Sequence, residues 1–131
     1  MENFGPFKNG KGILRDKSYK FALRTVNLYK YLSAEKREYV LSKQILRSGT
    51  SIGANVAEAQ QGQSKSDFIH KLSIALKESY ETSYWLDLLR DSEFISMEQS
   101  ISLMEDCIEL QKLLTASIKT AKKNGNRMTT G

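Results

Sequence analysis

The sequence predicts an all-α protein, an antiparallel up-down-up-down four-helix bundle. The chain has 131 residues and one proline, Pro6, which precedes every periodic segment. Beyond it, apolar residues recur at steps of three and four, as in amphipathic helices, and no segment alternates as a strand does. Turn-forming residues divide this region into four segments with short connections, which is typical of an up-down bundle. We expect a bundle domain over residues 16–125, a disordered or extended N-terminal tail at 1–15 and a C-terminal tail at 126–131.

The first helix is expected from Lys17 to Leu32, with Asp16 or Ser18 as its cap. Its broad apolar stripe comprises Phe21, Ala22, Val26, Leu28, Tyr29 and Leu32. Ser33 is then expected to cap a second helix, with Glu35 in the first turn of that helix.

The centre of the second helix contains two glycines. They cost about 1 kcal/mol each relative to alanine, so helix propensity alone would end the helix near Gly49. The apolar phase nevertheless continues unbroken from Leu41 to Val56, which favours one long helix held by packing. Its apolar face is formed by Leu41, Ile45, Ser48, Ile52 and Val56. Because Gly49, Gly53 and Ala57 recur every four residues, they line one side of this helix and let another helix approach closely.

The third helix follows a turn at residues 60–64. Ser64 and Asp67 form a capping pair at its start. Its apolar seam has a period near 3.5, the repeat of left-handed bundle packing. The seam consists of Phe68, Leu72, Ala75, Ser79, Thr82, Leu86 and Leu89.

The fourth helix follows a short connection, and Ser96 and Gln99 form a capping box at its start. It is expected to end near Asn124 and Gly125. Its apolar positions are Ile101, Leu103, Met104, Cys107, Ile108, Leu110, Leu114 and Ile118.

Apolar residues beside the third-helix seam make its apolar surface wider than packing within one bundle requires. Tyr84, Trp85 and Leu88 are therefore candidates for an oligomer interface, and burial in the core of the bundle is the alternative for the two aromatic residues.

Charge is segregated along the chain. The net charge is +5, but it is +7 over residues 1–57, −6 over 58–118 and +4 over 119–131. Such asymmetry indicates an anionic partner, although a solvated charged face is the common alternative. Two sets of cations share helix faces by their spacing: Lys17, Lys20 and Arg24 on the first helix, and Lys36, Lys43 and Arg47 on the second. If these two faces adjoin, they offer six cations for nucleic-acid phosphates.

No residue pattern predicts an enzyme. His70 is the only histidine, whereas a di-iron bundle needs two Glu-x-x-His pairs, and Cys107 is the only cysteine. Glu78 and Glu81 are best explained as part of a solvated face. No metal or cofactor is therefore expected.

Polar residues within the packing segment have a structural explanation. Asn55 and Glu58 are expected to be satisfied by neighbouring groups or to fix the helix register, and direct ligand contact is the alternative.

The composition also predicts the compartment. The N-terminal sequence MENFGPFKNGKGILRDK lacks the apolar stretch of a signal peptide, and no apolar run approaches the length of a membrane span. A single cysteine suits a reducing compartment. A cytoplasmic protein with no membrane contact is expected.

The segment SIGANVAEA at 51–59, followed by SKSDF and LSIALKESYETSYWLDLL, resembles a known family. It is similar to the four-helix-bundle proteins encoded in intervening sequences of bacterial 23S rRNA genes, which have carried a ribosomal-protein label. It is also similar to the accessory variability protein of diversity-generating retroelements. The sequence departs from the family at Gly53, where proline is common, and at Ala59, where glycine is common. The resemblance implies a bundle that assembles as a ring, a pentamer, with a basic surface expected to contact nucleic acid.

Two functions follow from these observations. The first is a non-enzymatic, oligomeric protein that binds structured RNA or DNA through its basic faces. The alternative is a structural module that binds a protein partner, such as a reverse transcriptase.

Overall fold

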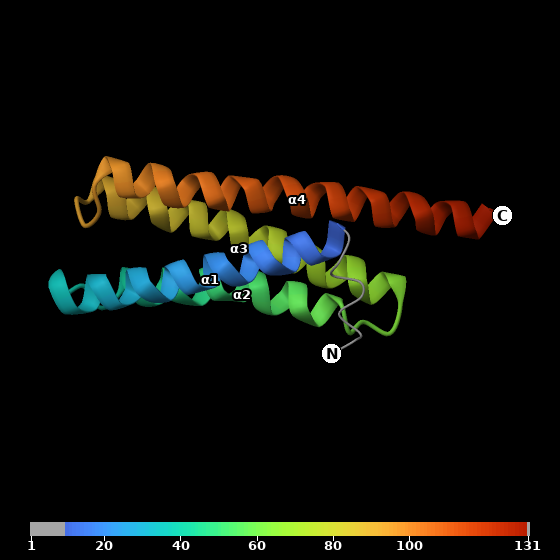
Figure 1. Cartoon of the computed structure of the whole chain (residues 1–131), viewed down its shortest axis with the longest axis horizontal. Coiled ribbons are helices and arrows are strands. Elements are labelled where there is room, and N and C mark those ends of the chain that lie inside the picture. Colours follow the sequence, from blue (N-terminus) through green and yellow to red (C-terminus); the bar gives the residue numbers. More distant parts are fainter. Residues whose placement is uncertain (1–9, 131) are drawn as a thin grey trace.

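The computed structural model describes residues 10–130, and the side chains of residues 12–124. Its helices are α1 (Gly10–Glu35), α2 (Leu41–Ala59), α3 (Lys65–Asp91) and α4 (Met97–Thr130). Successive helices run in opposite directions and lie side by side (Figure 1). Among the described residues, α1 contacts α2, α2 contacts α3, α3 contacts α4, and α4 contacts α1, with no diagonal pair in contact. The antiparallel four-helix bundle is therefore confirmed, and the α1–α4 and α2–α3 grooves lie on opposite sides of it.

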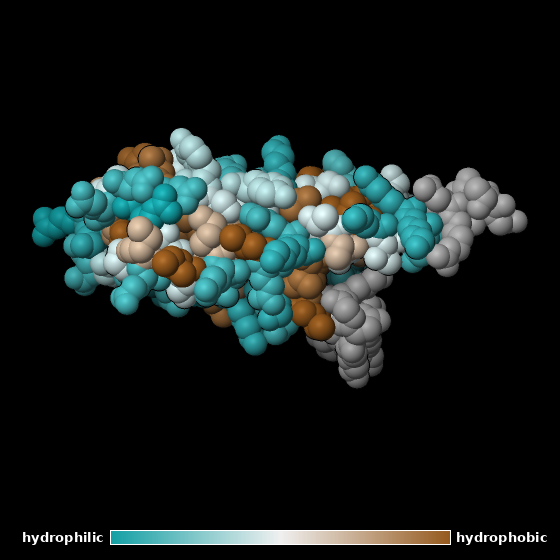
Figure 2. All heavy atoms as spheres, turned by 90° about the horizontal axis from the view of Figure 1, so that it is seen from above, coloured by the Kyte–Doolittle hydropathy of each residue, from teal (hydrophilic) through white to brown (hydrophobic). Residues whose placement is uncertain are grey.

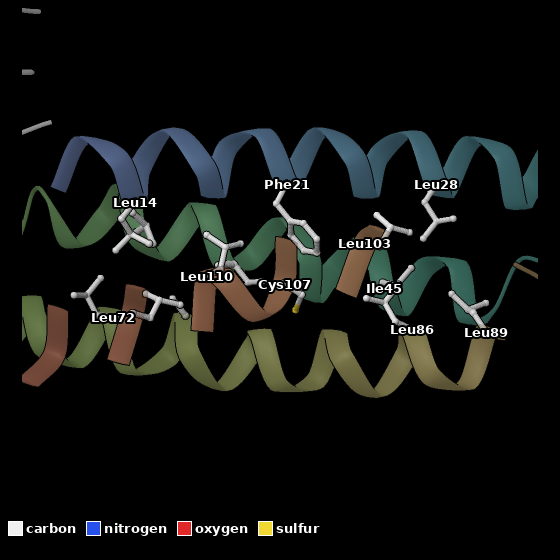
Figure 3. Packing of buried hydrophobic residues seen from close by; sticks show 14 of the residues in the cluster. Leu14, Phe21, Leu28, Ile45, Leu72, Leu86, Leu89, Leu103, Cys107 and Leu110 are labelled. Atoms are coloured by element: carbon white, nitrogen blue, oxygen red, sulfur yellow. The ribbon is translucent and has the colours of Figure 1, made fainter. Parts of the chain in front are cut away.

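The core consists of heptad-like seams from all four helices, and its side chains point into the space between them (Figure 3). The seam predicted for α3 is confirmed, because Leu72, Ala75, Ser79, Thr82, Leu86 and Leu89 are all buried. Phe68, the first seam residue, is partly buried against the core. Full burial of an aliphatic side chain contributes about 1.5–3 kcal/mol, so these seams supply most of the stabilisation.

Polar side chains occupy several core positions. Ser18 and Thr25 are buried in the seam of α1, whereas Ala22 and Val26, which the sequence predicts for the apolar stripe, are half-buried. The Thr82 hydroxyl donates to Ser48 Oγ at 2.8 Å and so joins α3 to α2. Among the described residues, every buried side-chain nitrogen and oxygen has a hydrogen-bond partner.

Helix α2 is continuous through both glycines, as the apolar phase predicts. A Cβ atom on Gly49 would lie 2.4 Å from Thr25 Cγ2, and one on Gly53 would lie 3.1 Å from the Ser18 carbonyl oxygen. These two glycines therefore face α1 at a close approach of the two helices. Ala57, the third small residue of the set, is half-buried.

The prediction that Ser33 caps α2 was wrong. Helix α1 continues to Glu35, and the Ser33 hydroxyl donates to the Tyr29 carbonyl within that helix at 2.8 Å. The start of α2 is instead held by Glu38, whose carboxylate accepts hydrogen bonds from three backbone N–H groups at 2.7–3.1 Å, those of Val40, Leu41 and Ser42.

Both ends of the bundle extend further than predicted. Helix α1 begins at Gly10 and buries Leu14, so residues 10–15 do not form a tail. Helix α4 runs to Thr130, so residues 126–130 are helical as well. The rest of the two predicted tails, residues 1–9 and 131, lies outside the described residues.

The predicted cap of the first helix, Asp16 or Ser18, was wrong, because α1 begins at Gly10 and the Ser18 hydroxyl donates to the Arg15 carbonyl within it at 3.1 Å. The capping predictions for α3 and α4 are confirmed. Ser64 Oγ accepts from the Asp67 N–H at 3.1 Å, and Ser96 and Gln99 exchange hydrogen bonds of 2.8 and 3.0 Å. None of the helices in the described part of the chain carries an apolar stretch of the length that crossing a bilayer requires.

Candidate functional site

The structure pairs the three predicted cations of α1 with acidic residues. Lys17 Nζ lies 3.2 Å from Glu109 Oε2, and Arg24 Nη1 lies 2.8 Å from Asp106 Oδ2, both across the groove to α4. Arg24 also donates to the backbone and the hydroxyl of Ser102 at 3.2 and 2.9 Å. These two predicted phosphate-binding residues therefore join α1 to α4.

The other cation of this predicted face is also paired. Lys20 Nζ lies 3.1 Å from Asp16 Oδ2, one turn earlier on α1. Because both side chains are largely exposed, this pair contributes little to stability.

The cations of the second predicted face have separate environments. Arg47 of α2 pairs with Glu78 at 3.2 Å and with Glu81, both on α3. Lys36 lies in the α1–α2 connection, with its ammonium 5.9 Å from the centre of the Tyr31 ring. Lys43 is exposed and forms no ion pair with a described residue.

Glu81 receives a second donor, because Trp85 Nε1–H donates to its carboxylate at 2.9 Å. This bond, together with Arg47, lowers the pKa of Glu81 although burial acts against it. The hydrogen bond to Glu81 raises the pKa of Arg47. Arg47 is thus part of a fixed cluster at the α2–α3 groove.

The structure does not bring the six predicted cations together. Lys17 and Arg24 lie at the α1–α4 groove, whereas Arg47 lies at the α2–α3 groove on the opposite side of the bundle. A single phosphate-binding face built from all six is therefore not formed within one chain.

A basic surface that the sequence argument did not assign lies on the second half of α4. Residues 97–109 contain four acidic and no basic residues, and residues 110–130 contain five basic and no acidic residues. Lys112, Lys119, Lys122 and Lys123 are exposed and form no ion pair with a described residue. The net charge of +4 over residues 119–131 was the signal in the sequence, and the spacing of Lys112, Lys119 and Lys123 places them on one helix face.

A shallow groove of about 400 Å³ lies between α3 and this part of α4. It is lined by Tyr80, Ile108, Gln111, Lys112, Thr115, Ala116 and Lys119. Tyr80 is 56% exposed. The groove therefore combines an accessible aromatic ring with two lysines.

On the face of the molecule turned toward the viewer in Figure 2, apolar patches lie between hydrophilic side chains.

The candidate oligomer residues differ in exposure. Tyr84 is 59% exposed, and its ring meets the Trp85 ring edge-on with a centroid distance of 5.0 Å. Trp85 is partly buried against the core, and Leu88 is half-buried. Of the three, Tyr84 is the residue most available to a second molecule.

The thiol of Cys107 is held in structural contacts. Cys107 is fully buried, and burial raises the pKa of its thiol although hydrogen bonds from Ser83 and Gln111 oppose this. Its Sγ–H donates to the Ser79 carbonyl at 3.2 Å. In the part of the chain that the structure describes, no three His, Cys, Asp or Glu side chains are grouped to hold a metal ion.

The polar residues of the packing segment have partners. Asn55 Nδ2 donates to the Ser51 carbonyl at 2.9 Å and to its hydroxyl at 3.1 Å. Glu58 pairs with Lys71 of α3 at 2.7 Å. Both residues fit the structural explanation that the sequence favours.

The fold and its segregated surface charge define an antiparallel four-helix-bundle protein. The sequence model of the 23S rRNA-intervening sequence protein family matches residues 12–116, and the chain belongs to this family. A solved structure from Bacteroides thetaiotaomicron, described as a protein with unknown function from the S23 ribosomal protein family, is 57% identical to it. The TM-score is 0.83, and the match covers 84% of this chain and 98% of that chain. No curated protein matches the chain.

Proposed function

We propose that this protein is a non-enzymatic homo-oligomer that binds structured RNA or DNA through phosphate contacts. The observation that carries the proposal is the segregation of charge along α4. The acidic half of this helix meets Lys17 and Arg24 of α1, whereas the lysines of its second half have no acidic partner among the described residues. Unpaired, exposed lysines on one surface are the electrostatic footprint of a phosphate-binding protein.

We propose no catalytic role because the reactive side chains are buried or engaged in hydrogen bonds. The Cys107 thiol is buried and hydrogen-bonded, and the Glu81 carboxylate is occupied by Arg47 and Trp85. A nucleophile or a general base needs a group that is accessible and free to react, whereas the thiol is buried and the carboxylate is engaged by two donors. The buried, unpaired thiol also suits a reducing cytoplasm, which is where we place the protein.

Self-association is supported by exposed apolar side chains on two helices. Ile13 and Leu23 of α1 are 51% and 48% exposed, and Met97 and Ile101 of α4 are 60% and 51% exposed. A ring needs two different surfaces on each subunit, because its contacts run head to tail. A pentameric ring, as the family resemblance implies, would also repeat the basic surface and so increase binding by avidity.

Nucleic-acid binding is tested by fluorescence anisotropy of labelled RNA and DNA hairpins at 50 and 200 mM salt. Four neutralised phosphates on a duplex give a slope of about −3.6 in a plot of log K against log salt. Binding at 50 mM should therefore weaken about a hundredfold at 200 mM. Absence of binding to both hairpins at 50 mM would overturn the proposal.

A second candidate function is a module that binds a protein partner. The exposed apolar residues Tyr84, Met97 and Ile101 favour it, because such side chains are enriched at protein interfaces. A pull-down from the native cell with nuclease treatment separates the two functions. A partner protein that stays bound after nuclease treatment favours the module, and partners lost with the nuclease favour nucleic-acid binding.

A further inference from the structure

We infer that the groove between α3 and α4 binds single-stranded nucleic acid, with a base stacked on Tyr80 and phosphates on Lys112, Lys119 and Lys123. The inference rests on the proposed function and assigns this groove to the single-stranded segments, such as hairpin loops, of the structured nucleic acid. Tyr80, Lys112 and Lys119 line the same groove, and Tyr80 is more than half exposed. A positively charged groove with an accessible aromatic ring is the usual platform for a single strand.

The spacing of the lysines fits a strand that runs along α4. Lys112, Lys119 and Lys123 lie on one helix face, and at 1.5 Å per residue they span about 16 Å. A stacked strand advances about 3.4 Å per nucleotide, so this length corresponds to roughly five nucleotides. The groove residues between the lysines, Thr115 and Ala116, have short side chains. A sugar-phosphate backbone can therefore approach the surface of α4 closely.

The groove stays cationic because most of the acidic residues near it are paired with cations on other sides of the bundle. Asp106 and Glu109, the acids of α4 closest to it in sequence, are paired with Arg24 and Lys17 on the α1 side. Glu78 and Glu81 of α3 are paired with Arg47 on the α2 side. Glu105 is exposed and lies one turn before Ile108, so it limits the cationic groove on that side.

Stacking on Tyr80 distinguishes a single strand from a duplex. The base faces of a duplex are covered by their neighbours, whereas a single strand can turn a base onto an exposed ring. A duplex would be held by the lysines alone. We therefore expect tighter binding of a single strand than of a duplex with the same number of phosphates.

The test measures anisotropy of a labelled, unstructured 24-nucleotide single strand and of a 12-base-pair duplex, which has the same total number of nucleotides. Tyr80→Ala should weaken binding of the single strand about tenfold and leave the duplex nearly unchanged. Tyr39→Ala is the matched control, because Tyr39 is 53% exposed but lies in the α1–α2 connection. Lys112→Ala with Lys119→Ala should weaken binding of both ligands and flatten the salt slope, and Lys30→Ala with Lys43→Ala, exposed lysines of α1 and α2, should do neither.

Each outcome separates this inference from the proposed function. Binding of the duplex without binding of the single strand would overturn the inference and leave the proposed function standing. Binding of neither would overturn both. Unchanged single-strand affinity in Tyr80→Ala would also overturn the inference. If Tyr80→Ala or the α4 double variant lowers the mass in solution instead, the groove is a contact between subunits and not a nucleic-acid site.

Discussion

Glu38 shows how one side chain fixes the start of a helix. It lies outside α2, it is only 9% exposed, and its carboxylate accepts from the backbone N–H groups of Val40, Leu41 and Ser42. These are donors that have no partner within a helix. Burial alone would raise the pKa of Glu38, but the three hydrogen bonds outweigh it and lower the pKa. The folded protein therefore holds Glu38 in its charged form.

Replacement of Glu38 should destabilise the protein in a pH-dependent way. Glu38→Ala leaves the N–H groups without this acceptor and should cost about 1–3 kcal/mol at pH 7. Because the folded pKa is lower than the unfolded pKa, the charged carboxylate stabilises the fold above the unfolded pKa. This contribution is lost as pH falls through the folded pKa.

Urea unfolding of the wild type and Glu38→Gln at pH 7 and pH 3 measures this effect. The difference between the two proteins should be larger at pH 7 than at pH 3. Glu35→Gln is the control, because Glu35 is exposed and lies in the last turn of α1. An equal difference at both pH values would show that the charge of Glu38 does not stabilise α2.

Local caps were predictable from the sequence, and the Glu38 cap was not. Ser64 and the Ser96–Gln99 box act within three residues of the helix start, so a short motif identifies them. Glu38 reaches forward over two to four residues, and no standard capping motif places glutamate there. Ser33 had the right residue type, but α1 continues through it because Leu32 is buried in the core.

At the scale of the helix, apolar periodicity predicted the core well where the seam is apolar. The α3 seam follows directly from the spacing of its apolar residues by three and four, because this spacing within one helix is enough to predict which of its residues are buried. The α1 seam was predicted less well, because Ser18 and Thr25 are polar but buried. They are buried because the glycines of α2 pack against them, a contact that involves a second helix.

The close approach of α1 and α2 makes Gly49 sensitive to substitution. Gly49→Ala gains about 1 kcal/mol of helix propensity, but its Cβ would lie 2.4 Å from Thr25 Cγ2 and 2.9 Å from Thr25 Cβ. The helices must then move apart, and we expect a net destabilisation of about 1–3 kcal/mol. Gly53→Ala should be nearly neutral, because its 3.1 Å contact with Ser18 O needs a smaller shift that the propensity gain can offset.

Urea denaturation of Gly49→Ala, Gly53→Ala, Thr25→Ala and the Gly49→Ala/Thr25→Ala double variant measures these energies. Removal of Thr25 Cγ2 should relieve part of the overlap, so the double variant should lose less stability than the single effects add up to. Strict additivity would contradict the steric explanation.

At the scale of the whole molecule, the basic faces show what a sequence cannot supply. The spacing of Lys17 and Arg24 correctly predicted that they share one face of α1. Their acidic partners lie on α4, and Asp106 is 82 residues from Arg24 in the sequence. Which side chains meet across a groove depends on the rotation and register of two helices, and the periodicity of one helix does not determine these. For the same reason, helical spacing alone could not show that Lys112, Lys119, Lys122 and Lys123 form no ion pair with a described residue.

The whole-molecule proposal of a ring depends on two distinct contact surfaces. The apolar residues of α1, which include Leu23, and those of α4, which include Ile101, are exposed on different helices. In a ring, the α1 surface of one subunit meets the α4 surface of the next, whereas a two-fold dimer uses the same patch on both subunits. The wild type is expected to form a closed ring with the mass of five 14.9 kDa chains.

Mixing two variants tests this head-to-tail arrangement. Leu23→Asp and Ile101→Asp each place a charge on one exposed surface, so each should fold, as judged by helical circular dichroism, and be monomeric by light scattering. Ile101→Asp keeps an intact α1 surface and Leu23→Asp keeps an intact α4 surface, so an equimolar mixture should form a heterodimer and nothing larger. A wild type that is monomeric at micromolar concentration would overturn self-association. Monomeric variants that fail to combine would overturn the head-to-tail ring, because a two-fold contact damaged on either partner cannot be complemented by mixing.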